Sequence, residues 1–225
     1  MNERKSGGPQ GGSGNGPGRP RGGRPGTVTG DMVSCWLCSH PVSQRALFCH
    51  HCGTVQPPRV LDPFTRLGLP VRFDVDLAVL ERQFTGFRRT LAPERFADKG
   101  PRERSNARAH LDALQHAYDT LRDPVRRARY LLDAARPPAA GTAAPIDPEL
   151  AALEAEAADA LDAAALDRLA NRAARDIEQC ILDLSAAFRA GELGSAAGVM
   201  ARLVRLEALA ATIRERRQRL PAGSA

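Results

Sequence analysis

The chain contains 225 residues, of which 43% are hydrophobic and 26% are charged, and this suffices for one or two packed domains and a tail. Only 4% of the residues are aromatic, and alanine, leucine and arginine dominate the second half, so the composition favours helices and argues against a β-sandwich. The net charge is +6 at pH 7, but residues 1–30 carry +4 of it, which argues against nucleic-acid binding by the rest of the chain.

The sequence has no run of 18 apolar residues, and its N-terminus lacks a hydrophobic segment. We therefore expect neither a membrane span nor a secretory signal. An arginine-rich tail is also typical of mitochondrial presequences, but 11 glycines within the first 30 residues oppose the amphipathic helix that such a presequence forms. The expected location is the bacterial cytoplasm, with a mitochondrial or plastid location as the lesser alternative.

Residues 1–32 are a low-complexity segment of glycine, proline and arginine that offers almost no side chains to bury. Such a composition predicts a disordered tail. Arginine-glycine segments can bind single-stranded RNA, but this one holds a single Arg-Gly-Gly and no aromatic residue for base stacking. A solubilising tail is the favoured interpretation, and a zinc-knuckle protein that binds nucleic acid through this tail is the alternative function.

Two Cys-x-x-Cys pairs, ten residues apart, follow the tail within residues 33–57. Each pair turns two thiolates toward one point, and two such turns complete the tetrahedral shell of a structural zinc ion. The alternative is a pair of disulfides, which the odd fifth cysteine and the missing secretory signal disfavour. Because cysteines fill all four positions, a catalytic zinc and hydrolase activity are not expected. The predicted zinc ligands are Cys35, Cys38, Cys49 and Cys52.

Residues 58–136 predict a helical hairpin followed by a third helix. Asp76 is a plausible N-cap, apolar residues then recur every three or four positions, and Pro93 ends this first helix. A second apolar stripe covers residues 107–121, so two helices can pack antiparallel around a loop of about a dozen residues. Asp123, followed by proline, starts the third helix. The loop that contains Pro93 therefore lies at one tip of the hairpin.

Residues 137–147 are interpreted as a linker, and residues 148–220 predict three further helices. Asp147, again followed by proline, has the sequence of a helix start. Two long amphipathic stripes follow, separated by two glycines. Three such helices can bury a shared core, so the whole chain is expected to be all-α apart from the zinc module.

Three other residues with reactive side chains have simpler explanations. Cys180 lies on the apolar stripe of a predicted helix, so we expect it to pack in the core rather than to act as a nucleophile. His110 and His116 lie on the second hairpin helix. We interpret both as surface or boundary residues and assign neither a ligand role.

Several segments resemble the HscB family of iron–sulfur cluster co-chaperones. The segments are DPFTRLGLP from Asp62, YDTLRDPVRRARYLL from Tyr118 and AAFRAGELGSAAGVMARLVRLEAL from Ala186, and the resemblance continues to about Leu220. The two cysteine pairs resemble those of the long family members, which carry an N-terminal zinc module. The resemblance implies an L-shaped molecule with an N-terminal J-domain and a C-terminal three-helix bundle.

The same resemblance implies two protein partners and no catalysis by the chain itself. The J-domain would dock on a heat-shock ATPase chaperone of the HscA or DnaK type. The bundle would hold the scaffold protein on which iron–sulfur clusters are built. No membrane partner is expected, and a homodimer through the zinc module stays open.

The trigger of the J-domain departs from the family pattern. Ala92, Pro93 and Glu94 stand where the family has His-Pro-Asp, and Arg88 and Arg89 stand on the basic helix that faces the chaperone. Alanine lacks the imidazole, and glutamate displaces the carboxylate by one methylene, which weakens any geometry-dependent contact with an arginine. We therefore expect scaffold delivery with weak stimulation of the ATPase.

The resemblance also supplies a scaffold-binding surface on the bundle. Leu150, Leu153 and Glu154 stand where the family uses an apolar pair and a carboxylate, and we expect them to form an exposed patch. Arg205 stands where an aromatic residue would be expected at the edge of this patch.

Overall fold

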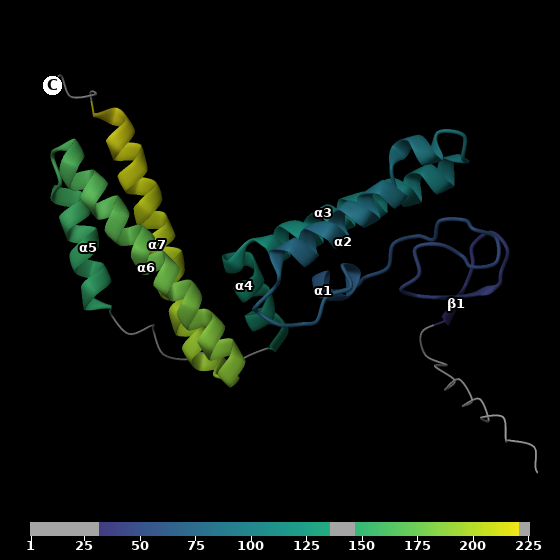
Figure 1. The fold of residues 1–225 in the computed structure, drawn as a ribbon, viewed down its shortest axis with the longest axis horizontal. Coiled ribbons are helices and arrows are strands. Elements are labelled where there is room, and N and C mark those ends of the chain that lie inside the picture. Colours follow the sequence, from purple (N-terminus) through teal and green to yellow (C-terminus); the bar gives the residue numbers. More distant parts are fainter. Residues whose placement is uncertain (1–31, 136–146, 221–225) are drawn as a thin grey trace, which may run out of the picture.

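The computed structural model describes residues 32–135 and 147–220, and it shows two helical arms that meet at a corner (Figure 1). Nearly all of the predicted tail and of the predicted linker lies outside the described residues, and the last tail residue, Met32, begins β1. In chain order the elements are β1 (Met32–Ser34), β2 (Pro41–Ser43), α1 (Pro63–Arg66), α2 (Leu77–Thr90), the 3₁₀-helix η1 (Pro93–Phe96), α3 (Pro101–Arg122), α4 (Pro124–Ala135), α5 (Pro148–Asp159), α6 (Ala163–Ala190) and α7 (Leu193–Arg219).

The first arm is the hairpin of α2 and α3. Asp76 caps α2 as predicted, since its carboxylate accepts hydrogen bonds from the main-chain N–H groups of Ala78 and Val79. The helix ends at Thr90, and Pro93 begins η1 in the loop at the hairpin tip. The facing apolar stripes form a core to which α1 also contributes. The fully buried large side chains of this core are Phe64, Leu67, Leu80, Leu91, Leu114 and Leu121.

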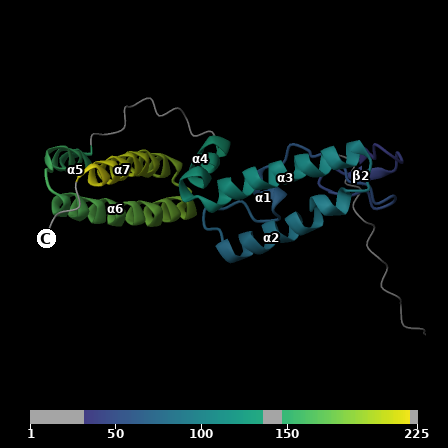
Figure 2. The same cartoon turned by 90° about the horizontal axis from the view of Figure 1, so that it is seen from above.

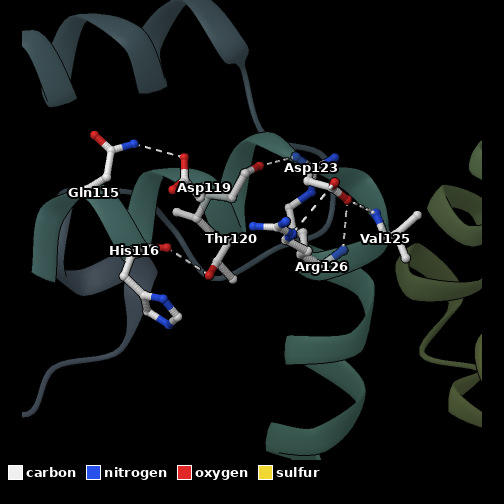
Figure 3. Close-up of polar contacts among 9 residues, drawn as sticks. Gln115, His116, Asp119, Thr120, Asp123, Val125 and Arg126 are labelled. Atoms are coloured by element: carbon white, nitrogen blue, oxygen red, sulfur yellow. Dashed lines mark hydrogen bonds and ion pairs between the residues drawn. The ribbon is translucent and has the colours of Figure 1, made fainter. Parts of the chain in front are cut away.

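Helix α4 forms the corner between the arms (Figures 1 and 2). Asp123 starts it as predicted: one carboxylate oxygen accepts hydrogen bonds from the N–H groups of Val125 at 2.8 Å and Arg126 at 3.0 Å (Figure 3). Leu131 packs against the apolar cores of both arms. Helix α4 therefore follows α3 directly in the chain and packs against both the hairpin and the bundle.

The second arm is the bundle of α5, α6 and α7, in which α6 and α7 lie side by side (Figures 1 and 2). Gly191 ends α6 in the left-handed conformation, with φ of 73°, which turns the chain back into α7. Cys180 is buried in the core of this arm, as predicted. None of the helices in the two described segments combines the length and apolarity needed to cross a bilayer.

The end of α5 is closed by an arginine from the last turns of α7. The Arg216 guanidinium donates hydrogen bonds to the main-chain oxygens of Ala157, Ala158 and Ala160. The last carbonyl groups of a helix have no partner within the helix, and here a side chain 56 residues further along the chain supplies one.

The two arms are also joined by the segment that connects α1 to α2. Phe73 is 4% exposed and stacks on Phe188 of α6, with ring centroids 5.1 Å apart. Its neighbour Asp74 accepts a hydrogen bond from the Ser185 hydroxyl at 2.6 Å and lies 3.5 Å from Nε of Arg189. The corner is therefore packed and hydrogen-bonded as well as covalently connected.

We predict that Phe73→Ala lowers the free energy of unfolding by about 3 kcal/mol, because it removes a buried ring and leaves a cavity between the arms. Urea unfolding followed by circular dichroism measures this loss. Val71→Ala, at a 64% exposed position of the same segment, is the control and should change the free energy by less than about 0.5 kcal/mol. Equal losses in the two variants would contradict the assigned role of Phe73.

Candidate functional site

The four predicted metal ligands converge on one point. Cys35 and Cys38 lie in the turn between β1 and β2, and Cys49 and Cys52 lie in a turn that follows β2. All four sulfur atoms lie within 4.8 Å of one another. The Cys35–Cys52 and Cys38–Cys49 sulfur distances are 3.8 and 3.7 Å. A disulfide requires about 2.05 Å. Four thiolates around a tetrahedral ion with metal–sulfur bonds of about 2.3 Å lie about 3.8 Å apart, so this geometry fits a metal site.

The surroundings shift the pKa of two of these thiols in opposite directions. Burial raises the pKa of the Cys35 thiol, but hydrogen bonds from two main-chain N–H groups and from Gln56 outweigh burial and lower this pKa to about 6. A main-chain hydrogen bond from His40 lowers the pKa of Cys38, but burial and the neighbouring thiols raise it to about 12. Neighbouring thiolates in so close a cluster repel one another. A thiophilic metal ion would neutralise them.

The cysteine module packs on the start of α3. Trp36 donates a hydrogen bond from Nε1 to the Val55 carbonyl at 2.8 Å, and the Arg102 guanidinium lies 4.3 Å from the centre of the indole ring. The Thr54 hydroxyl donates to the Glu103 carboxylate at 3.0 Å. Val55 is itself part of the hairpin core. The module therefore packs against α3, the helix that follows the loop with Ala92, Pro93 and Glu94, which we call the trigger loop.

The interpretation of His110 as a surface or boundary residue is wrong. Its side chain is 4% exposed, and Nε2 lies 2.8 Å from the main-chain oxygen of Gln56. Burial lowers the pKa of this imidazole, so the neutral form is favoured. The sequence contained a usable signal, because His110 follows Ala107 by three positions and precedes Leu114 by four on the apolar stripe.

The five residues carried over as the chaperone contact lie together at the hairpin tip. Arg88 and Arg89 are exposed in the last turn of α2, and Ala92, Pro93 and Glu94 lead into η1. All five line one surface hollow of about 420 Å³, together with side chains of α2 and α3. The predicted tip position of this loop is therefore confirmed, and its role in binding stays a prediction.

Ala92 is half-buried at the edge of this hollow. Ala92 is the N-cap of η1, with φ of −54° and ψ of 133°, and its side chain makes no capping hydrogen bond. Glu94 lies in the first turn of η1 and is exposed. The hollow thus offers two guanidinium groups and one carboxylate, without an imidazole.

The expectation that Leu150 and Leu153 are exposed is wrong. Both side chains are 1% exposed and belong to the core of the bundle. Leu150, Leu153 and Ala157 form the short apolar stripe of α5. This stripe packs against α6 and α7. These two leucines therefore hold the bundle together and do not offer a surface to a partner.

Glu154 remains at the surface, and Arg205 explains its orientation. The Glu154 carboxylate is 38% exposed and lies 2.6 Å from Nη2 of Arg205 on α7. On the same side, Arg202 lies 2.7 Å from the Asp147 carboxylate and 3.6 Å from that of Glu149. The arginine that departs from the family pattern thus pairs with the carboxylate that matches it. This surface of α5 and α7 is polar, with alternating carboxylates and guanidinium groups.

No family model matches the chain, whereas sequence relatives match part of it. The co-chaperone protein HscB of Proteus mirabilis is 39% identical over 72 residues, which are 32% of this chain and 42% of the relative. The iron-sulfur cluster co-chaperone protein HscB of Mus musculus is 31% identical over 102 residues, which are 44% of this chain and 44% of the relative. The matches thus span less than half the length of these curated relatives.

Solved structures match over more of the chain. Human co-chaperone protein HscB superposes with a TM-score of 0.73 over 84% of this chain and 100% of that chain, at 22% identity. Chaperone HscB from Vibrio cholerae superposes with a TM-score of 0.59 over 71% of this chain and 99% of that chain, at 26% identity. Both have the arrangement of a helical J-domain and a helical bundle described above. The sequence relatives match part of the chain and the solved structures match most of it, and both sets are HscB co-chaperones to which this chain is similar.

Proposed function

We propose that this chain is an adaptor of iron–sulfur cluster assembly. It binds the scaffold protein with its bundle and presents it to a heat-shock ATPase chaperone of the HscA or DnaK type with its hairpin. The chain contributes binding surfaces and no catalytic group. The single observation that carries this proposal is the HscB-like fold in which Arg88, Arg89 and Ala92–Glu94 lie together at the tip of the hairpin, away from the bundle.

The chaperone would approach the hairpin tip. Two exposed guanidinium groups at the end of α2 can attract an acidic surface and form bidentate contacts with its carboxylates. Pro93 fixes the direction of the loop without needing a partner. Ala92 supplies neither a donor nor an acceptor, so binding is expected to exceed activation.

The scaffold would approach the exposed side of α5 and the adjoining side of α7. Glu154 and Arg205 form the centre of this surface, and Glu149 and Arg202 extend it toward the start of α5. The buried leucines of α5 support this surface from below. Charged groups at the rim of an interface chiefly steer a partner and fix its orientation, and a carboxylate that becomes desolvated on binding contributes more.

We further propose that the four-cysteine site holds a structural zinc ion. The arrangement of four thiolates leaves no open position for a water or substrate, so the metal would stabilise the fold and perform no chemistry. Metal binding of this kind supplies about 10–16 kcal/mol of apparent folding free energy in zinc-finger peptides. The hydrogen bonds and the ring contact with α3 then hold the ordered module against the hairpin.

Protein purified without chelator should contain one zinc ion per chain, measured by elemental analysis. Cys49→Ser should reduce the zinc content at least about tenfold, because oxygen replaces one of the four thiolates. Removal of the metal should unfold residues 33–55 while the helical circular dichroism signal persists, since the helices have cores of their own. Cys180→Ser is the matched control and should retain its zinc, because this cysteine lies in the bundle core. A zinc-free wild-type protein would refute the metal proposal.

The altered trigger should stimulate the partner ATPase weakly. Ala92→His with Glu94→Asp should raise the stimulated rate about fivefold, equivalent to about 1 kcal/mol, because it restores a hydrogen-bonding ring and the shorter carboxylate. Steady-state ATP hydrolysis by a DnaK-type chaperone measures the effect. Ala155→His with Glu156→Asp makes the same changes on exposed α5 and should leave the rate unchanged. No gain in the trigger double variant would show that this loop no longer engages the chaperone in the family's manner.

Glu154→Ala should weaken binding to a purified iron–sulfur scaffold about five- to tenfold, because it removes a carboxylate from the centre of the proposed surface. Its effect on stability should stay below about 1 kcal/mol, the usual range for an exposed ion pair. Glu215→Ala is the control, since it also breaks an exposed ion pair, with Arg219, at another part of α7. Isothermal titration calorimetry measures the affinity for the scaffold. Equal affinities of the wild type and both variants would show that the scaffold does not bind at Glu154.

A further inference from the structure

One buried amide, that of Gln56, lies between the metal site and the hairpin. Its side chain is 5% exposed, and Nε2 lies 3.4 Å from Sγ of Cys35 and 3.1 Å from the main-chain oxygen of Thr54. The amide therefore donates one hydrogen to a metal-ligating sulfur and the other to the backbone of its own module. Such a buried polar group has a defined orientation, because both donors are used.

The main chain of the same residue faces the hairpin. The Gln56 oxygen lies 2.8 Å from Nε2 of His110, which is 4% exposed on α3. The Gln56 N–H donates to the Leu47 carbonyl at 2.8 Å, which closes the module behind the second cysteine pair. Cys35, Gln56 and His110 thus form one continuous path from a metal ligand to the interior of the J-domain.

We propose that Gln56 is a positioning residue for the metal site, which orients the Cys35 thiolate and transmits the order of the loaded module to the first half of α3 through His110. The proposal rests on the metal site put forward under Proposed function. Groups that hydrogen-bond to metal ligands commonly change metal affinity 10- to 100-fold when they are removed. We expect the ordering of the module to reach α3, because the first half of this helix carries both His110 and the ring contact with Trp36. Helix α3 begins directly after the trigger loop.

A purely structural role for Gln56 makes a different prediction. If the amide only fills space and satisfies the Thr54 carbonyl, its loss would destabilise the metal-free and metal-bound proteins alike. A positioning role instead changes the bound metal itself. The electronic state of the Cys35 sulfur separates these cases, because a hydrogen bond to a thiolate lowers the energy of its lone pairs.

The first experiment uses the full chain and two substitutions of similar volume. Gln56→Leu removes the donor, and Gln56→Glu replaces it with a carboxylate that repels the thiolate. Competition with a chromophoric chelator should show about tenfold weaker Zn²⁺ binding for Gln56→Leu and weaker binding still for Gln56→Glu. Gln179→Leu, which removes an exposed amide hydrogen bond on α6, should bind Zn²⁺ as tightly as the wild type.

The second experiment replaces zinc with Co²⁺, whose thiolate charge-transfer band reports on the sulfur ligands. Gln56→Leu should shift this band to longer wavelength, because the Cys35 sulfur loses a hydrogen bond and becomes a better electron donor. A purely structural role would leave the band in place. The helical circular dichroism signal should match that of the wild type, which shows that the variant is folded when its spectrum is recorded.

The third experiment follows the path to the hairpin. Zn²⁺ should slow hydrogen–deuterium exchange in residues 101–110 of the wild type, and His110→Leu should lose this slowing while its Zn²⁺ affinity stays within about threefold of the wild type. Unchanged affinity and an unshifted cobalt band in Gln56→Leu, with zinc bound to the wild type, would overturn the role of Gln56 alone. A wild type that binds neither ion would instead overturn the metal site itself.

Discussion

The packing of α4 on both sides is the constraint on which the two-arm shape depends. Arg127 is 7% exposed, donates a hydrogen bond to the Leu121 carbonyl at the end of α3, and lies 4.9 Å from the centre of the Phe73 ring. Its charge is thus buried against a carbonyl and an aromatic face, and the carboxylates of Asp74 and Asp123 also attract it. Leu131 joins the cores on either side of the same helix. The hairpin and the bundle are therefore joined by one short helix that packs against both.

Much of this architecture could be predicted from local chemistry. Asp76, Asp123 and Asp147 each lie before a helix and cap it through hydrogen bonds to main-chain N–H groups within the next three residues. The cysteine pairs could be assigned as ligands for a similar reason, since each tight turn aims two sulfurs at one point whatever the rest of the fold does. Features that depend on a few neighbouring residues were therefore accessible without the structure.

The errors arose where the answer depended on distant parts of the chain. An apolar pair on α5 looks the same in sequence whether it faces a partner protein or α7, and only the packing shows that Leu150 and Leu153 are internal. The resemblance assigned Leu150 and Leu153 to a partner surface, although both lie on the buried side of α5. The burial of His110 depends on distant residues in the same way, because the carbonyl that it contacts comes from a module more than 50 residues earlier.

The closure of α5 by Arg216 has a consequence for synthesis of the chain. A ribosome releases α5 well before the last turns of α7, so the terminal carbonyls of α5 have no side-chain partner until almost the whole described chain has emerged. The hairpin and the cysteine module, whose apolar cores are built from residues 35–131, have no such delay. The domain that would meet the chaperone can thus be complete while the domain that would hold the scaffold is still assembling, which orders the appearance of the two binding surfaces during translation.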